Sequence, residues 1–231
     1  VEYYDGSLKG RQTVTKSNTL DTTIVAETFY DRQGRPAIQV LPAPYYNNII
    51  EYVHNFNVNS LNAAYSAADF DTIIANNFCD AAADSMKSTS GASYYYSPLN
   101  SAKNIGFNQY IPDAKDYPFT ETQYDADNTG RIEKQGGVGP NHQLGSGHET
   151  TYYYGTPTQR ELDALFGTDA GIYSHYLKTM VQDPNGQLSI SYTDMKGRTI
   201  ATMLAGTPPD SIHLDALPTE TSFPFTATRI N

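Results

Sequence analysis

Histidine and acidic side chains near the middle of the chain could bind a metal ion. His142, His148 and Glu149 lie in or beside a glycine-rich segment, residues 136–147. The spacing of the two histidines is not the i, i+4 spacing that places two zinc ligands on one helical face. No third ligand follows at a diagnostic spacing. We therefore expect exposed loop residues here and assign no metal site.

A second candidate is the acidic stretch from Asp125 to Gly130, which is similar to the opening of an EF-hand loop. The position that should supply a bidentate glutamate is Gly136, so the oxygen cage for calcium would be incomplete. A turn with a long loop explains the same residues. We assign no calcium ion and no other cofactor.

Other reactive groups have simpler structural interpretations. Asp80 and Asp84 could be paired carboxylates, but acids four residues apart on a helix are typical of a solvated face. Cys79 is the only cysteine, which excludes an internal disulfide, and we expect a small buried residue. His54 is expected to be a hydrogen-bonded core histidine on an apolar strand face. No residue is nominated as catalytic, and no enzyme is predicted.

Two runs of three tyrosines leave a binding function open. Residues 94–96 and 152–154 could stack on sugars through their rings. Neighbouring side chains of a strand point to opposite faces, so at least one face of each run is expected to serve packing. A glycan-binding or adhesin surface therefore remains the alternative function.

The composition of the chain excludes some classes of binding partner. The formal net charge is −10, which argues against nucleic acid, because nucleic-acid binding is driven by a basic surface. No stretch has the ~20 apolar residues that a membrane helix needs. The sequence starts with Val1 and no signal peptide is apparent. We expect a piece of a longer protein.

The most regular feature of the chain is an aromatic-Asp pair followed by a Gly-Arg dipeptide. Four of the seven arginines directly follow a glycine, far more than random order would give. The units are Tyr4-Asp5 with Gly10-Arg11, Tyr30-Asp31 with Gly34-Arg35, Tyr124-Asp125 with Gly130-Arg131, and Tyr192 and Asp194 with Gly197-Arg198. Such self-similarity is typical of repeat architectures.

The spacing in the second and fourth units predicts tight hairpins. Asp31 and Asp194 suit the first position of a type I turn, where the carboxylate accepts a backbone N–H. Gly34 and Gly197 suit the positive φ that closes the hairpin through a bulge. In the first and third units two further residues precede the glycine, which predicts a longer loop. The unit therefore predicts structure and not chemistry.

Each repeated arginine leaves its turn as the first residue of the returning strand. If the hairpins stack side by side, every arginine should meet the same aromatic-Asp corner. There a guanidinium can lie on a tyrosine ring and donate to an aspartate, a combination that lysine reproduces poorly. We expect these arginines to join hairpin to hairpin and to bind no ligand.

A mostly β, antiparallel fold with two short helices is predicted. The first forty residues form strands, and Pro42 and Pro44 end the ladder. Helices are expected at residues 71–87 and after a capping box at Thr158 and Glu161. Further strands are predicted at residues 52–58, 94–96, 152–154, 176–182, 187–193 and 198–204, the last three forming an antiparallel meander.

The Tyr-Asp-x-x-Gly-Arg unit, best seen from Tyr30 to Arg35, resembles the YD repeat of Rhs proteins. Longer runs strengthen the resemblance and are similar to the N-terminal, pre-core part of very large secreted bacterial Rhs proteins. These runs are residues 110–113, 117–120, 136–140, 144–150, 183–186, 192–194 and 197–202.

The resemblance implies a segment of a β-shell in a secreted or surface-displayed protein, and many such shells enclose a C-terminal toxin. Its implied partners are other segments of its own longer chain. We expect a repeat segment over residues 1–206, with insertions at about residues 50–117 and 132–175, and an irregular Pro- and Thr-rich tail at residues 207–231.

Overall fold

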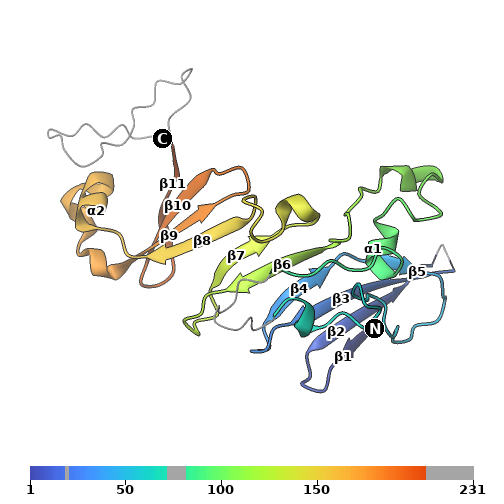
Figure 1. The fold of residues 1–231 in the computed structure, drawn as a ribbon. Helices are drawn as coiled ribbons and strands as arrows, with labels where there is room; N and C mark the ends of the chain where they lie inside the picture. Colours follow the sequence, from blue (N-terminus) through green and yellow to red (C-terminus); the bar gives the residue numbers. More distant parts are fainter. Residues whose placement is uncertain (19–20, 72–81, 207–231) are drawn as a thin grey trace. The chain divides into compact units, whose positions relative to one another are not determined.

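The computed structural model describes residues 1–18, 21–71 and 82–206. The described chain is mostly antiparallel β-structure, with eleven strands and two short α-helices, as predicted (Figure 1). It divides into two compact units, Val1–Glu149 and a second that begins at Thr150. The division falls within the second predicted insertion.

Three hairpins form the sheet of the first unit. Its strands are β1 (Glu2–Tyr4), β2 (Gly10–Lys16), β3 (Thr23–Tyr30), β4 (Pro36–Val40), β6 (Phe119–Tyr124) and β7 (Ile132–Gly136), paired in that order. All neighbours are antiparallel. The turns at Asp5, Asp31 and Asp125 therefore lie at the same end of the sheet.

Alternation along the strands creates the buried face. In β3 every second residue is buried, including Val25 and Phe29, and Val14 of β2 faces Val25 directly. A short strand, β5 (Ala43–Tyr45), pairs with the other half of β3. The prediction that Pro44 ends the ladder is therefore wrong. Proline is compatible with such a short edge strand, where its missing N–H costs no ladder bond.

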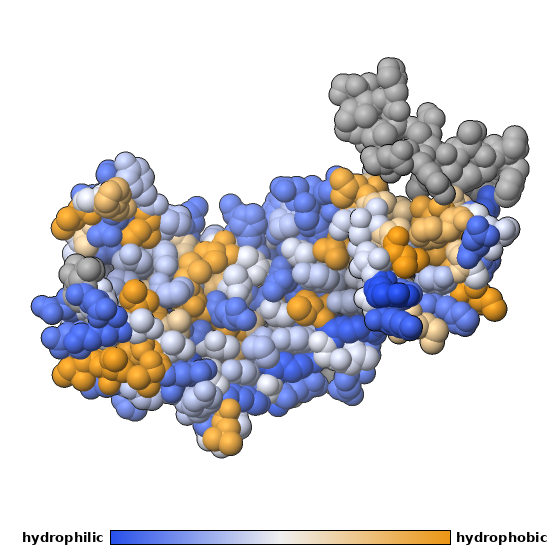
Figure 2. Space-filling view, turned by 180° about the vertical axis from the view of Figure 1, so that it is seen from behind, coloured by the Kyte–Doolittle hydropathy of each residue, from blue (hydrophilic) through white to orange (hydrophobic). Residues whose placement is uncertain are grey.

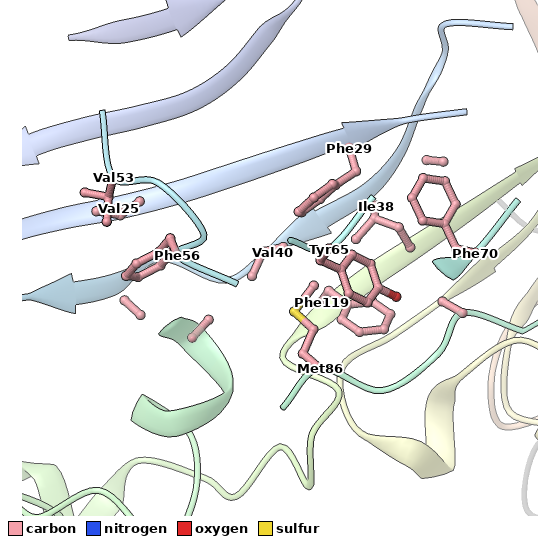
Figure 3. Close-up of a cluster of buried hydrophobic side chains, with 14 of the residues drawn as sticks. Val25, Phe29, Ile38, Val40, Val53, Phe56, Tyr65, Phe70, Met86 and Phe119 are labelled. Atoms are coloured by element: carbon pink, nitrogen blue, oxygen red, sulfur yellow. The ribbon is translucent and has the colours of Figure 1, made fainter. Parts of the chain in front are cut away.

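The described parts of the chain between β5 and β6, residues 46–71 and 82–118, cover the buried face. They contain two 3-10 helices, η1 (Ala67–Asp69) and η2 (Gly106–Tyr110), and the short α-helix α1 (Gly91–Tyr95). Tyr65 is 1% exposed and lies with Phe119, Ile38 and Met86 in the core (Figure 3). Its hydroxyl donates to the Asp84 carbonyl at 2.7 Å, so the polar end of the buried ring is satisfied.

The predicted strand at residues 52–58 does not form. Asn55 has a φ of 52°, which interrupts extended backbone, and only isolated bridges form at Val58 and Asn59. His54 is consequently exposed, with its ring against Tyr52, and is not the core histidine that alternation predicted.

Two further predictions concern the covering segment: one lies mostly outside the described residues and the other is wrong. Of the predicted helix at residues 71–87, residues 72–81 lie outside the described part, and residues 82–87 are not helical. Tyr94 and Tyr95 lie in α1 and not in a strand. Asn57 explains the helix, because its side-chain oxygen accepts the Ala92 N–H at 2.9 Å near the helix start.

The second unit is a four-stranded meander with one helix against it. Its strands β8 (Thr150–Gly155), β9 (Tyr176–Gln182), β10 (Leu188–Asp194) and β11 (Thr199–Ala205) pair in sequence order. The predicted meander and the predicted strand at residues 152–154 are confirmed. Two 3-10 helices, η4 (Gly167–Ala170) and η5 (Tyr173–His175), precede β9. A further 3-10 helix, η3 (Pro140–His142), lies in the first unit, as η1 and η2 do.

The predicted helix of this unit is α2 (Gln159–Phe166). Thr158 and Glu161 form the predicted capping box, and Gly167 follows the last helical residue. Leu162 is fully buried, and Lys178 of β9 pairs with Glu161. The box therefore fixes both the helix start and its attachment to the sheet.

Candidate functional site: the Tyr-Asp turns

The turn at Asp31 has the predicted geometry. The Gly34 N–H donates to the Asp31 carbonyl at 2.8 Å, and Gly34 has a φ of 80°. The Asp31 carboxylate accepts the Arg35 N–H at 2.7 Å, and a bulge follows Phe29 in the pairing of β3 with β4. This is a type I turn closed by a glycine bulge.

The second unit contains two turns of the same kind. At Asp194 the Gly197 N–H donates to the Asp194 carbonyl at 2.9 Å, and Gly197 has a φ of 75°. At Asp183 the corresponding bond from Gly186 is also 2.9 Å. The predicted positive φ of Gly34 and Gly197 is confirmed.

The turn at Asp5 departs from the prediction. It closes at Leu8, whose N–H donates to the Asp5 carbonyl at 3.0 Å and whose φ is 61°. Lys9 thereby occupies the place that arginine takes in the other turns, and Gly10 already belongs to β2. The predicted longer loop is wrong here, because leucine occupies the left-handed conformation expected of the glycine.

The turn at Asp125 does carry the predicted longer loop. The Asp125 N–H donates to the Arg131 carbonyl at 2.8 Å, and Gly130 has a φ of 74°. The Asp127 carboxylate accepts the Thr129 hydroxyl and N–H and pairs with Arg131, and these bonds lower the pKa of Asp127 to about 2. The Asp127 carboxylate thus finds its hydrogen-bond and ion-pair partners within its own loop.

A contact between neighbouring hairpins follows from this geometry. The Arg35 guanidinium lies 4.4 Å from the centre of the Tyr124 ring while its Nε donates to Asp31 at 2.7 Å. The Tyr124 hydroxyl donates to the Pro36 carbonyl at 3.0 Å. The Arg35 guanidinium of one turn thus stacks on the tyrosine of the next hairpin in the sheet. The hydroxyl of that tyrosine donates to the backbone carbonyl of Pro36, the residue that follows the arginine.

The same arrangement occurs one hairpin earlier. Lys9 lies 5.4 Å from the centre of the Tyr30 ring, and the Tyr30 hydroxyl donates to the Gly10 carbonyl at 2.9 Å. We call this pair of contacts the cross-hairpin clamp. Two clamps link the three hairpins of the first unit in series, which confirms the expected environment for Arg35.

The remaining arginines do not share one environment, so that prediction is wrong. Arg11 lies 3.6 Å from the centre of the Phe29 ring and donates to the Thr28 and Tyr65 carbonyls. Arg198 bonds to Asp194 at 2.7 Å, but its side chain is 72% exposed. Lys9 and Arg35 thus contact the tyrosine of the next hairpin, whereas Arg11 contacts Phe29 and Arg198 is exposed.

A buried polar network attaches the covering segment to the sheet. Gln12 donates to Glu27 at 3.0 Å and exchanges two hydrogen bonds with the Val53 backbone. Asn57 donates to the other Glu27 oxygen at 2.8 Å, and Arg11 lies 3.7 Å from this carboxylate. Sequence reasoning missed the network, because its members are polar residues within an otherwise apolar alternation.

A cavity of about 300 Å³ lies beside the second clamp, and no pattern in the sequence predicted it. Glu121, which is 4% exposed, lines it together with Lys134. Burial raises the pKa of the Glu121 carboxyl to about 7. A glutamate inside an alternating strand gives no signal of this environment in the sequence.

The metal and acid candidates remain separate from these features. The His142 and His148 rings are 6.2 Å apart between centres, but the described residues contain no cluster of three or more potential metal ligands. Cys79 and Asp80 lie outside the described residues, and Asp84 uses its backbone to bond Tyr65 and Asp69.

The tyrosine runs divide between packing and exposure. Tyr95 and Tyr96 pack against the core, and Tyr96 donates to the Pro42 carbonyl at 2.8 Å. Tyr153 in β8 is 44% exposed. On the face seen in Figure 2, hydrophobic residues form separate patches between hydrophilic ones.

Comparison with known proteins adds no assignment: no family model matches the chain, and no curated protein matches it. Within residues 1–18, 21–71 and 82–206, no helix is long and apolar enough to cross a membrane.

Proposed function

We propose that this chain is a structural, non-catalytic segment of a secreted or surface Rhs/YD-repeat protein. Its hairpins build, or close one end of, a β-shell, and its partners are other segments of its own longer chain. Such a shell would enclose a toxin or other cargo.

The observation that carries the proposal is the cross-hairpin clamp. Arg35 is engaged by Asp31 and Tyr124, and Lys9 by Tyr30, so these repeat residues are occupied within the sheet. A repeat that joins each hairpin to the next can extend a sheet by adding further copies.

Imaging of the intact secreted protein tests this proposal. Electron cryo-microscopy should place residues 1–206 in the wall or at the end of a β-shell, with further hairpins of the same polypeptide beside them. A map in which this segment forms an isolated module, separated from the other repeats, would overturn it.

A glycan-binding surface is the competing function, and exposed tyrosines favour it. Tyr46 is 68% exposed and Tyr110 is 75% exposed. A glycan array separates the two functions: binding that is lost in Tyr46→Ala and Tyr110→Ala variants would support the adhesin. Absence of binding would leave the shell segment as the better account.

A further inference from the structure

The cavity beside the second clamp is lined by the polar side chain of Glu121, which projects from the core-facing side of the sheet. Glu121 of β6 pairs with Ile38, which is fully buried, and partners in register project from the same face. Asp31, Phe70, Asp71 and Tyr124 are among the residues that line the cavity. Its volume, about 300 Å³, is at the lower end for ligand sites.

The Glu121 carboxylate forms few contacts that would stabilise the fold. One carboxylate oxygen accepts the Ala83 N–H at a long 3.3 Å, and the described residues give the other oxygen no partner. A buried carboxylate without a charged partner is costly, and an apolar residue would pack beside Ile38 at lower cost. An ionisable group retained in a cavity at such a cost is a candidate for binding.

Lys134 supplies an opposite charge on the same face. Gln123 pairs with Lys134, and Glu121 pairs with Gly136, so Lys134 and Glu121 are diagonal neighbours across β6 and β7. Diagonal neighbours have Cα atoms about 7–8 Å apart. Among the described residues, neither of these two side chains forms an ion pair.

The other charged groups that line the cavity already have partners. Arg35 and Asp31 bond to each other at 2.7 Å, and the Asp71 carboxylate accepts the Arg32 N–H at 2.7 Å. The ligand would therefore have to complement Glu121 and Lys134. A carboxylate and an ammonium group that line one cavity can bind the opposite charges at the two ends of a small molecule.

We propose that this cavity binds a small zwitterion of the α-amino-acid type. The ligand's ammonium group donates to Glu121 and its carboxylate accepts from Lys134, with a small side chain directed towards Phe70. Glu121, which is buried, and Lys134, which is half-buried, each then gain a charged partner.

Thermal melts of the protein with each standard amino acid at about 10 mM test the proposal. A ligand present well above its Kd should raise the melting temperature by about 5 °C. The shift should be larger at about pH 8 than at about pH 6, because the ionised form of Glu121 binds the ammonium group. The amide and the N-acetyl derivative of the same amino acid, each lacking one charge, should give little shift.

Variants locate the site. Glu121→Gln and Lys134→Met keep the shape of each side chain and should each abolish the ligand-induced shift. Glu133→Gln, on the opposite face of β7, and Lys16→Met, in β2, should keep it. The proposal fails if no amino acid shifts the wild-type melting temperature, or if the shift survives in both cavity variants. It also fails if the amide alone binds as tightly as the parent amino acid.

Discussion

Single residues decide where each turn closes. Gly34 and Gly197 occupy the left-handed backbone conformation, whereas the Asp5 turn places Leu8 there with a φ of 61°. A leucine in that conformation stores strain that a glycine would not. Leu8 is 84% exposed, so no burial compensates for the strain. The sequence spacing predicted that Gly10 closes this turn, but the turn closes two residues earlier, at Leu8.

A comparison of two valine substitutions tests the turn at Asp194. Gly197→Val should destabilise the protein by about 1–3 kcal/mol, because a β-branched residue is strained at a φ of 75°. Thr199→Val should change stability by no more than about 0.5 kcal/mol, since Thr199 is exposed in a strand. Urea unfolding measures both. Equal losses would contradict the turn assignment.

Glu121 gives the stability of the protein a specific pH dependence. Burial raises its pKa from 4.5 to about 7, so the folded state binds a proton more tightly than the unfolded chain. Stability from this group is complete below about pH 4.5 and is lost as the pH rises through about 7, by roughly 3 kcal/mol. Glu121→Gln should therefore be more stable than the wild type at about pH 8 and similar to it at about pH 4.

Urea unfolding across this pH range provides the measurement, and Glu133→Gln is the control. If the difference between wild type and Glu121→Gln does not change with pH, the carboxyl is not buried as described.

At the scale of elements, local signals determine α2. The Thr158 hydroxyl accepts the Glu161 N–H, and the Glu161 carboxylate accepts the Thr158 N–H at 2.7 Å. Thr158→Ala should destabilise the second unit by about 0.5–2 kcal/mol. Thr156→Ala, two residues earlier and outside the helix, should have little effect. Circular dichroism melts measure both variants. The same loss of stability in the two would show that the capping box does not stabilise α2.

Elements with complete local signals could be predicted from the sequence, whereas those fixed by distant partners could not. Asp183 and Asp194 with their glycines determine the meander almost alone. Tyr94 and Tyr95 favour a strand by propensity, yet Asn57 binds the start of α1 from far along the chain. Val53 is bound by Gln12 across a separation of 41 residues, and Asn55 interrupts the extended backbone, so alternation alone could not predict the conformation of residues 52–58.

In the candidate site, too, the features with local signals could be predicted and those that depend on strand register could not. The turn residues and the stacking of Arg35 on a tyrosine follow from the repeat itself. Lys9 was missed because the repeat pattern pointed to Arg11. Glu121 and Lys134 meet at one cavity only through the register of β6 and β7, which no local pattern encodes.

At the scale of the whole molecule, the repeat provides cohesion between hairpins. Lys9 with Tyr30 and Arg35 with Tyr124 connect the first unit along one end of its sheet. Arg198 offers a matched comparison within the same chain, because it bonds to its own aspartate at the same 2.7 Å but has a largely exposed side chain. Arg198→Gln should therefore cost no more than the ~0–1 kcal/mol of an exposed ion pair.

The central claim is that the repeat joins hairpins, and a double-mutant cycle on Arg35 and Tyr124 tests it most directly. Amide hydrogen exchange in β4 and β6 would report the stability of the wild type, Arg35→Gln, Tyr124→Leu and the double variant. The stacked pair should give a coupling free energy of about 0.5–2 kcal/mol, with Arg35→Gln more costly than Arg198→Gln. A coupling energy of zero, with equal losses for the two arginine variants, would contradict the claim.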